Sequence, residues 1–189
     1  MARPREFDET QALAQARVLF WRDGYGATSL ADLLGAMAIS KSSFYETFGS
    51  KHELFLRALA DYQDERASQV QSQLAEGPDA RSAIEALFRG LGLGEQSRGC
   101  MSCNEAVELG HSDPAVVAQV ATALTGFETL LERTVSRGQR EGSIGTSRDA
   151  ASLARLLSVG FTGLQVMIRS RTDRARLDET IDIILTLLD

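Results

Sequence analysis

The stretch TSLADLLGAMAISKSSFYETFGSK, at positions 28–51, constrains the fold more than any other part of this chain. Ser29 followed by Asp32 is typical of a helix start, and Ser40 followed by Ser43 begins a second short helix. Apolar side chains recur on both segments at spacings that let two short helices share one small core. These side chains are Leu30, Leu33, Leu34, Ile39, Phe44 and Phe48. The pattern predicts a helix-turn-helix with the second helix presented outward.

The outward face of the second helix is built from mostly small polar side chains. With Phe44 and Phe48 in the core, this face presents Lys41, Ser42, Ser43, Tyr45, Glu46 and Thr47. Such side chains can reach base edges and phosphates in a DNA major groove, which a bulky or strongly acidic face could not enter. Gly49 ends the helix and Ser50 begins another, so Lys51 lies in a first turn whose free N–H groups suit a phosphate.

We therefore predict a set of DNA-contacting residues around this motif. The set is Thr28, Ser29, Lys41, Ser42, Ser43, Tyr45, Thr47, Lys51 and His52. Lys41 and Lys51 are the only two lysines among the 20 basic residues and flank the second helix. For either lysine, an ordinary solvated surface position is the alternative interpretation.

Residues 1–6 form a short arm that is expected to add to these contacts. Pro4 keeps the arm extended, and Arg3 and Arg5 project from it. Two arginines suit the negative potential of a narrow minor groove, and a solvated tail is the alternative.

The distribution of charge agrees with a DNA-binding N-terminal region. Residues 1–52 hold 6 basic and 6 acidic side chains, and the remainder holds 14 basic and 20 acidic ones, so the net charge of -6 lies entirely in the C-terminal part. Because DNA repels an acidic body more than a neutral head, this asymmetry favours binding through the N-terminal end.

The N-terminal part of the sequence resembles a known protein family. The run FDETQALAQARVLFWRDGYGATSLADLLGAMAISKSSFYETFGSKHELFLRAL is similar to the N-terminal DNA-binding domain of the TetR (tetracycline-repressor-like) family of bacterial transcription regulators. The resemblance covers residues 5–60. It is carried by Gly24-Tyr25, Thr28-Ser29, Phe44-Tyr45-x-x-Phe48 and Ser50-Lys51-x-x-Leu54. The family usually has Gly where this chain has Ala38, so the turn should avoid a left-handed conformation or be slightly strained.

The resemblance implies an all-α fold in two parts. Residues 1–52 would form a three-helix helix-turn-helix DNA-binding domain, and residues 53–189 a helical ligand-binding and dimerisation domain. Composition agrees, because an apolar fraction of 43% supports a packed core and only three prolines interrupt the chain. The implied protein is a cytoplasmic homodimer without cofactor or metal. It binds palindromic operator DNA, most often as a repressor, and is released by a small molecule.

Periodicity and breaks predict helices at 79–93, 100–111, 113–140, 147–170 and 174–188. The last two are apolar over more than one face, so we expect one side in the core and the other at a two-fold interface. The predicted interface consists of Leu157, Gly160, Leu164, Ile181, Ile184, Leu185 and Leu188. A monomer with one thick core is the alternative.

Side chains from several of these helices are expected to line an effector pocket, apolar with a few polar groups. The predicted lining is Phe88, Leu91, Met101, Cys103, Asn104, Val107, Leu124, Phe127, Leu131, Phe161, Leu164 and Gln165. The same residues could instead fill a solid core. An alternative interpretation of the whole chain is a helical small-molecule-binding domain with a vestigial DNA-binding domain.

The two cysteines, Cys100 and Cys103, allow three interpretations. Buried structural thiols are one, and a thiol sensor of oxidants or electrophiles is another, since Arg98 and a helix start can lower a thiol pKa. Metal binding is the third, although a closed zinc site needs four ligands and only His111 lies near. Two cysteines three positions apart do not form a disulfide framework, which favours a reducing compartment.

The charged residues do not indicate an enzyme. The carboxylates of Glu105, Glu108 and Glu128 have no accompanying nucleophile, oxyanion element or phosphate loop. No apolar run reaches the ~20 residues of a membrane-spanning helix.

Overall fold

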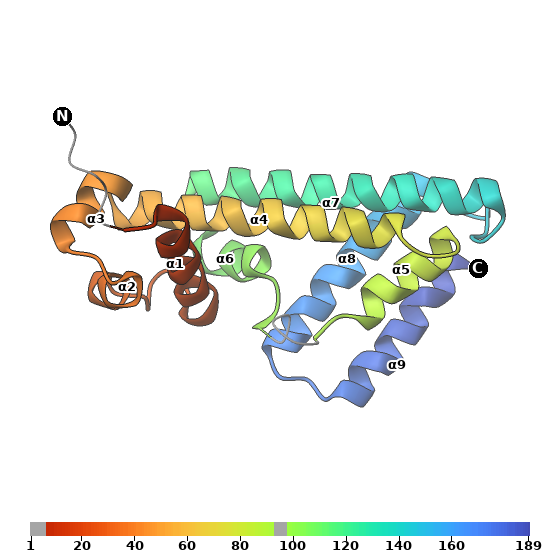
Figure 1. Cartoon of the computed structure of the whole chain (residues 1–189). Helices are drawn as coiled ribbons and strands as arrows, with labels where there is room; N and C mark the ends of the chain where they lie inside the picture. Colours follow the sequence, from red (N-terminus) through yellow and green to blue (C-terminus); the bar gives the residue numbers. More distant parts are fainter. Residues whose placement is uncertain (1–6, 93–97) are drawn as a thin grey trace.

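The computed structural model describes residues 7–92 and 98–189, and every regular element in those two ranges is helical. Figure 1 shows a small N-terminal unit at one end of an elongated helical body. The elements in chain order are α1 Glu9–Asp23, α2 Leu30–Met37, α3 Lys41–Phe48, α4 Lys51–Ala75, α5 Ala80–Arg89, α6 Met101–Leu109, α7 Pro114–Glu141, α8 Ala150–Arg169, α9 Arg174–Leu185 and the 3-10 turn η2 Thr186–Leu188. The all-α prediction is confirmed.

Side-chain caps set where the N-terminal helices begin. Asp8 accepts the Thr10 and Gln11 N–H groups at the start of α1. Ser29, Ser40 and Ser50 each accept the N–H of the residue three positions later, at the starts of α2, α3 and α4. At α2 the Asp32 side chain also accepts the Ser29 N–H, which completes a capping box. These helix starts are therefore encoded locally.

The head, defined as α1 to α3, has its own aromatic core. Phe20, Phe44 and Phe55 have no exposed surface, and the Phe20 and Phe55 rings meet edge to face at 5.2 Å. Phe55 belongs to α4, and Met101 of α6 and Val116 of α7 are buried in the same cluster. The core of the head thus extends across the predicted domain boundary at residue 52.

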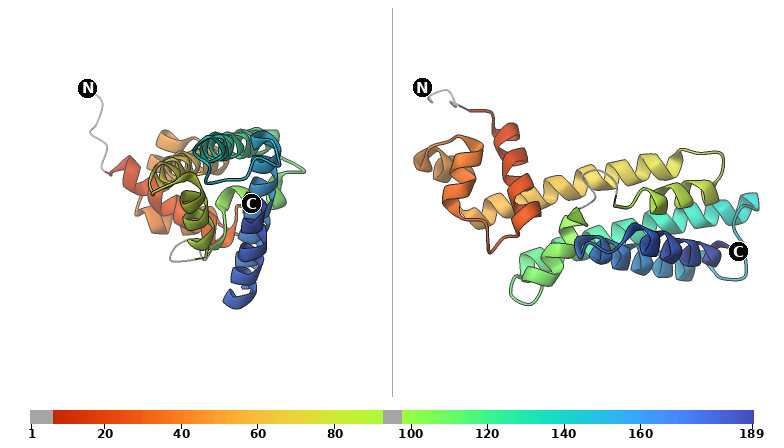
Figure 2. Two further views of the ribbon diagram at one scale, coloured as in Figure 1. Left: turned by 90° about the vertical axis from the view of Figure 1, so that its right-hand side faces the viewer. Right: turned by 90° about the horizontal axis from the view of Figure 1, so that it is seen from below.

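The body is organised around two long helices that run side by side in the same direction. Asp113, at the start of α7, pairs with His52 at the start of α4, and Arg137 near the end of α7 donates to the Leu74 carbonyl near the end of α4. α8 returns along α7, and α5 and α9 close the far end (Figures 1 and 2). α6 lies under α4, between the head and α8.

α7 and α8 are each long and apolar enough to cross a membrane by length and composition alone, with mean hydropathies of 1.3 and 1.4 in their most apolar windows. Core helices of soluble proteins pass the same test, and 44% of the α8 window is buried in this chain. The α7 window is only 17% buried, and part of that helix lines a cavity described below.

The turn between α2 and α3 is strained and does not avoid the left-handed conformation. Ala38, at the C-terminus of α2, has φ 53° and ψ 40°, the left-handed conformation that glycine tolerates better than alanine. Its N–H still donates to the Gly35 and Leu34 carbonyls. The turn therefore keeps its hydrogen bonds at a cost of conformational strain.

Replacing Ala38 with Gly should stabilise the protein by about 0.5–1 kcal/mol, because relief of the left-handed strain exceeds the extra chain entropy of glycine. Thermal unfolding measured by calorimetry would test this. The matched change Ala36→Gly, at an exposed position inside the same helix, should lower stability by about 1 kcal/mol. A lower melting temperature for Ala38→Gly would contradict the strain.

Candidate DNA-binding surface and effector cavity

The structure presents one face of α3 to solvent. Lys41, Ser42, Tyr45 and Glu46 are exposed, with Tyr45 at 48%, while Phe44 and Phe48 are buried beneath them. Ser43 and Thr47 are half-buried at the edges of the face. Ser29 is exposed at the start of α2. Both α3 and the start of α2 lie at one end of the molecule, where a DNA duplex can approach (Figure 1).

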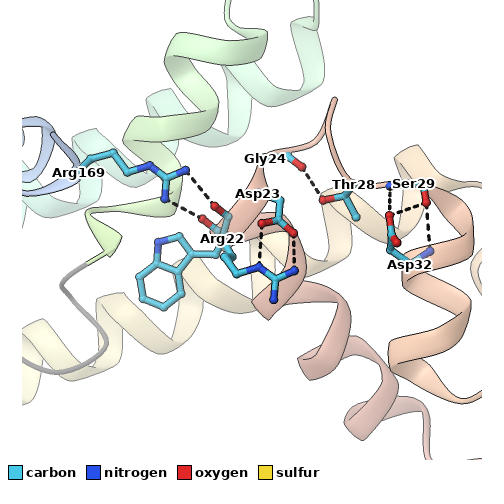
Figure 3. A network of polar contacts seen from close by, with 8 residues as sticks. Arg22, Asp23, Gly24, Thr28, Ser29, Asp32 and Arg169 are labelled. Atoms are coloured by element: carbon cyan, nitrogen blue, oxygen red, sulfur yellow. Dashed lines mark hydrogen bonds and ion pairs between the residues drawn. The ribbon is translucent and has the colours of Figure 1, made fainter. Parts of the chain in front are cut away.

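Three residues of the predicted DNA-contact set are placed differently. Thr28 is 1% exposed, and its hydroxyl donates to the Gly24 carbonyl at 2.7 Å (Figure 3), so its side chain is structural. The Lys51 ammonium donates to the Tyr25 carbonyl at 2.6 Å and lies 4.3 Å from the centre of the Tyr25 ring. Burial there lowers the pKa of Lys51. Lys51 therefore braces the head, and its contact with a phosphate stays a prediction.

His52 also has a structural partner. Its Nε2 lies 2.6 Å from the Asp113 carboxylate, which caps α7. Hydrogen bonding to His52 holds the pKa of Asp113 below its ordinary value. His52 thus joins the start of α4 to the start of α7, and its contact with DNA stays a prediction. Arg3 and Arg5 lie outside the described residues.

One carboxylate on α6 joins the head to the body. Glu108 accepts the Tyr25 N–H at 3.1 Å and the Gly26 N–H at 2.6 Å. Gly24 has φ 88°, and a Cβ there would come within 2.4 Å of the Glu108 carboxylate. Only glycine fits this close approach without a shift. The glycine that ends α1 is explained by this contact.

Three further hydrogen bonds join the body to the end of α1. The Trp21 indole N–H donates to the Gly99 carbonyl, just before α6, at 3.1 Å. Arg169, at the end of α8, donates to the Arg22 carbonyl at 3.1 Å and the Trp21 carbonyl at 3.4 Å (Figure 3). The orientation of the head is therefore fixed by both ends of α6 and by the end of α8.

A cavity of about 1060 Å³ opens beside α6, between α4, α7 and α8. Its wall is mostly apolar or small, which suits an organic molecule. Five of the predicted pocket residues line it: Cys103, Leu124, Phe127, Phe161 and Gln165. Cys100, predicted only as a redox residue, also lines it.

The other predicted pocket residues do not line this cavity. Phe88, Leu91, Leu131 and Leu164 are at most 1% exposed and fill the core of the body. Met101 is buried in the core of the head, and Val107 is 79% exposed on the outer face of α6. Asn104 is half-buried and donates to the Arg98 carbonyl. Periodicity identified these side chains as apolar or inward but not which interior space they face.

Sequence reasoning missed the α4 wall of the cavity. Tyr62, Gln63 and Arg66 of α4 and Thr162 of α8 all line it. Gln63 donates to the Ser102 hydroxyl at 3.1 Å. A signal was present, because polar side chains recur every three to four residues on the same α4 face as buried Tyr62.

The predicted dimer interface needs a correction. Leu157, Leu164, Ile181, Leu185 and Leu188 are at most 4% exposed within one chain, so they have no surface for a partner. Gly160 packs against Ile184 inside the protomer, where a Cβ would lie 3.1 Å from the isoleucine. The exposed apolar side chains of α8 and α9 are instead Leu156, Val159, Val166 and Ile183, which we call the α8/α9 apolar face.

Glu105 is a buried acid on the inner side of α6. It is 1% exposed, and its Oε2 has no partner within the described residues. Burial, reinforced by the nearby Glu108 charge and opposed by Arg169, raises its pKa to about 8. Glu105 is therefore mostly protonated at neutral pH. Within the described ranges, no group of three or more His, Cys, Asp and Glu side chains is arranged to hold a metal ion.

Replacing Glu105 with Gln should stabilise the protein increasingly as pH rises. The folded pKa of about 8 exceeds the ordinary 4.5, so the wild type loses stability between these values. The loss is about 1.4 kcal/mol per pH unit, and Gln does not titrate. Melting temperatures should be closest near pH 5 and furthest apart near pH 8. The exposed control Glu179→Gln should show no such divergence, and parallel curves for Glu105→Gln would contradict the raised pKa.

Comparison with known families places both parts of the chain. Residues 80–184 match the domain described as "Tetracyclin repressor-like, C-terminal domain". Residues 12–58 match "Bacterial regulatory proteins, tetR family". The chain is 29% identical over 194 residues to the uncharacterized HTH-type transcriptional regulator YezE of Bacillus subtilis, with all of both chains covered. It is 31% identical over 143 residues to the HTH-type transcriptional repressor BdcR of Escherichia coli, covering 72% of this chain and 73% of that protein.

Solved structures share the fold over nearly the whole chain. One is a cysteine mutant of the TetR family transcriptional regulator CifR complexed with 26bp double-strand operator DNA. It matches with a TM-score of 0.86 and 31% identity, covering 99% of this chain and 100% of that one. The reduced form of Escherichia coli NemR matches with a TM-score of 0.86 at 19% identity, covering 95% and 96%, and supports the fold alone.

Proposed function

Because this chain belongs to the TetR family of transcriptional regulators, which are not enzymes, we propose that it is a cytoplasmic repressor that binds palindromic operator DNA as a homodimer and is released by a small organic effector. The observation that carries the proposal is the exposed polar face of α3, held outward by the buried Phe44 and Phe48. The CifR relative, 31% identical, is complexed with operator DNA.

Operator contact is supported by the chemistry of the α3 face. Lys41 offers a phosphate contact at the start of the helix, and Tyr45 offers a hydroxyl and a ring for base edges. Ser42 and Ser29 add short hydroxyl groups that fit close to the backbone of the duplex. A helix of this composition enters a major groove without unpaired charge, apart from Glu46.

Dimerisation is supported by the α8/α9 apolar face. Val159 and Ile183 are each 64% exposed, and Leu156 and Val166 are about half exposed. A Cβ at Gly163 would meet nothing within 4 Å, so a partner helix can come close there. Exposed apolar side chains on two adjacent helices are typical of a subunit interface, and a two-fold dimer is what palindromic DNA requires.

Effector release is supported by the position of the cavity. Its wall includes Cys100, Ser102 and Cys103 on α6, and the opposite end of α6 holds the head through Glu108. A molecule that fits the cavity better when α6 is displaced lowers the affinity of the protein for DNA. By linkage, DNA lowers the affinity of the protein for that molecule by the same factor.

Replacing Lys41 with Ala should weaken binding to the DNA upstream of the protein's own gene and flatten its salt dependence. Each lost phosphate contact lowers the slope of log affinity against log salt by about 0.9, so a dimer should lose about two. Fluorescence anisotropy at several salt concentrations measures both effects. Tyr45→Ala should weaken binding to the operator more than binding to unrelated DNA.

Arg140→Ala is the matched control, because it removes one exposed positive charge at the far end of α7. Its affinity and salt slope should match those of the wild type. If the Lys41 and Arg140 variants behave alike, the α3 face is not the DNA-binding surface.

Placing a charge on the α8/α9 apolar face should separate the dimer. In Val159→Glu or Ile183→Glu, a partner would bury an unpaired carboxylate, which costs several kcal/mol. Light scattering should give the mass of one chain for these variants and of two for the wild type. Val117→Glu is the control, since Val117 is 46% exposed on α7 near the head. If the Val159→Glu and Ile183→Glu variants remain dimeric, the interface does not lie on the α8/α9 apolar face.

A further inference from the structure

The two cysteines lie together at the start of α6, on the wall of the cavity. Cys100 is the residue that precedes the first helical turn, with φ -89° and ψ 125°, and Cys103 lies within that turn. Cys100 is half-buried and Cys103 is buried, and both line the cavity. Tyr62 of α4 and Thr162 of α8 face them across the same space. A molecule in the cavity therefore contacts a pair of thiols.

The groups around Cys100 favour its thiolate. A hydrogen bond from the Cys103 thiol outweighs the effect of burial, and the Tyr62 hydroxyl and the N–H groups of Cys103 and Ser102 add to it. Together they lower the pKa of Cys100 to about 6. The pKa values of Cys103 and Tyr62 are raised, so both groups remain protonated donors. Arg66, also on the cavity wall, acts in the opposite direction on Tyr62, since its positive charge lowers the pKa of that hydroxyl slightly.

The rest of the wall indicates an organic occupant with a polar group. Gln165 is 4% exposed and lines the cavity, yet its amide oxygen has no partner within the described residues. The amide oxygen of Gln119, on the α7 side, is likewise unpartnered. Such buried amides are costly unless a ligand or water satisfies them. Phe127 and Phe161, with ring centres 4.9 Å apart, supply an apolar surface beside them.

We propose that Cys100 is a covalent sensor that captures a small organic electrophile, of the class with a carbon-carbon double bond conjugated to a carbonyl group, inside this cavity. The proposal rests on the proposed function, because capture is read out as release of DNA. It names the effector class and the atom to which the effector bonds, the Sγ of Cys100.

The reaction balances with water as the only other reactant. The Cys100 thiolate forms a bond to the terminal carbon of the double bond, whose π electrons move to the carbonyl and give an enolate. The enolate carbon then takes a proton from water in the cavity, with the Cys103 thiol and the Tyr62 hydroxyl placed to relay it. The product is a thioether, and no group is oxidised or reduced.

The geometry favours this reaction over a disulfide between Cys100 and Cys103. The hydrogen bond to Cys100 raises the pKa of Cys103, so Cys103 acts as a donor to the Cys100 thiolate and not as a second nucleophile while that thiolate is present. A disulfide also needs an oxidant, whereas the addition needs none. Sensing a peroxide also requires little space, whereas this cavity measures about 1060 Å³ and has an aromatic wall. Its size and composition match a carbon-based molecule.

The adduct would form next to a contact that orients the head. Gly99, directly before Cys100, accepts the Trp21 indole N–H at 3.1 Å. Space there is limited, because a Cβ at Gly99 would lie 2.8 Å from the Gln165 carbonyl oxygen. A thioether on Cys100 removes the thiolate that holds Tyr62 and Cys103, so the start of α6 must repack. The Gly99–Trp21 hydrogen bond is then the first contact affected.

The test uses N-ethylmaleimide as the electrophile and N-ethylsuccinimide, its saturated analogue of nearly the same shape, as the noncovalent control. Intact-protein and peptide mass spectrometry should show one maleimide on Cys100, with a rate that rises through a pH midpoint near 6. The labelled dimer should bind operator DNA roughly 5- to 150-fold more weakly, the usual range of coupling between two sites. The succinimide should have no effect.

Three variants separate the roles of the groups. Cys100→Ser should bind DNA normally, with loss of both labelling and release. Cys103→Ser should still be labelled, since a serine hydroxyl can donate to the thiolate. Tyr62→Phe should move the pH midpoint of labelling upward, an effect that a purely structural tyrosine would not have.

Several results would overturn the proposal. They are labelling of Cys103 in place of Cys100, release of DNA by the maleimide in Cys100→Ser, release by the succinimide, or release that accompanies only a Cys100–Cys103 disulfide formed with peroxide. Labelling is measured without DNA. If Cys100 is labelled as expected but the unlabelled protein does not bind operator DNA, the proposed function is wrong, whereas the assignment of Cys100 as the reactive thiol stands.

Discussion

Two backbone N–H groups of the head donate to a single carboxylate of the body, and this contact ties the loop after α1 to α6. The Tyr25 and Gly26 amides, in the loop after α1, both donate to Glu108. A partly buried amide without a partner costs free energy comparable to a lost hydrogen bond, so the loop has reason to remain where this carboxylate is. The absence of a Cβ at Gly24 lets the carboxylate come close enough. The local backbone of the head is thereby tied to α6.

Other side chains hold the head and the adjoining helix starts at further points. Lys51 holds the Tyr25 carbonyl, and His52 joins α4 to α7 through Asp113. Arg169 holds the last carbonyls of α1 from the end of α8. Lys51 and His52, which the sequence pattern assigns to DNA contact, thus also hold the helices around α3 in place. The α3 face stays exposed, and most of the acidic remainder of the chain lies toward the other end of the molecule.

Local signals were enough to predict most of the helices, but not which side of each helix is buried. Ser29, Ser40 and Ser50 cap helices as expected, because a cap involves only the next three residues. Leu156 and Leu157 show the limit. They are adjacent and equally apolar, yet one is 47% exposed and the other is fully buried. A wide apolar stripe does not say which side faces its own chain. The Asp113 partner of His52 is likewise invisible to any local pattern, since it lies 61 positions away.

The length of α6 explains how a cavity and a DNA-binding head can influence one another. Cys100 and Glu108 are eight positions apart, which is about 12 Å along a helix at about 1.5 Å per residue. Over two turns a helix moves nearly as a rigid body, so a displacement at Cys100 is carried to the carboxylate that holds Tyr25 and Gly26. Occupancy alone does not shift this equilibrium. The occupant must fit better when α6 has moved, and a group added to Cys100 would meet this condition because it replaces the thiolate that the Cys103 thiol and the Tyr62 hydroxyl hold in place.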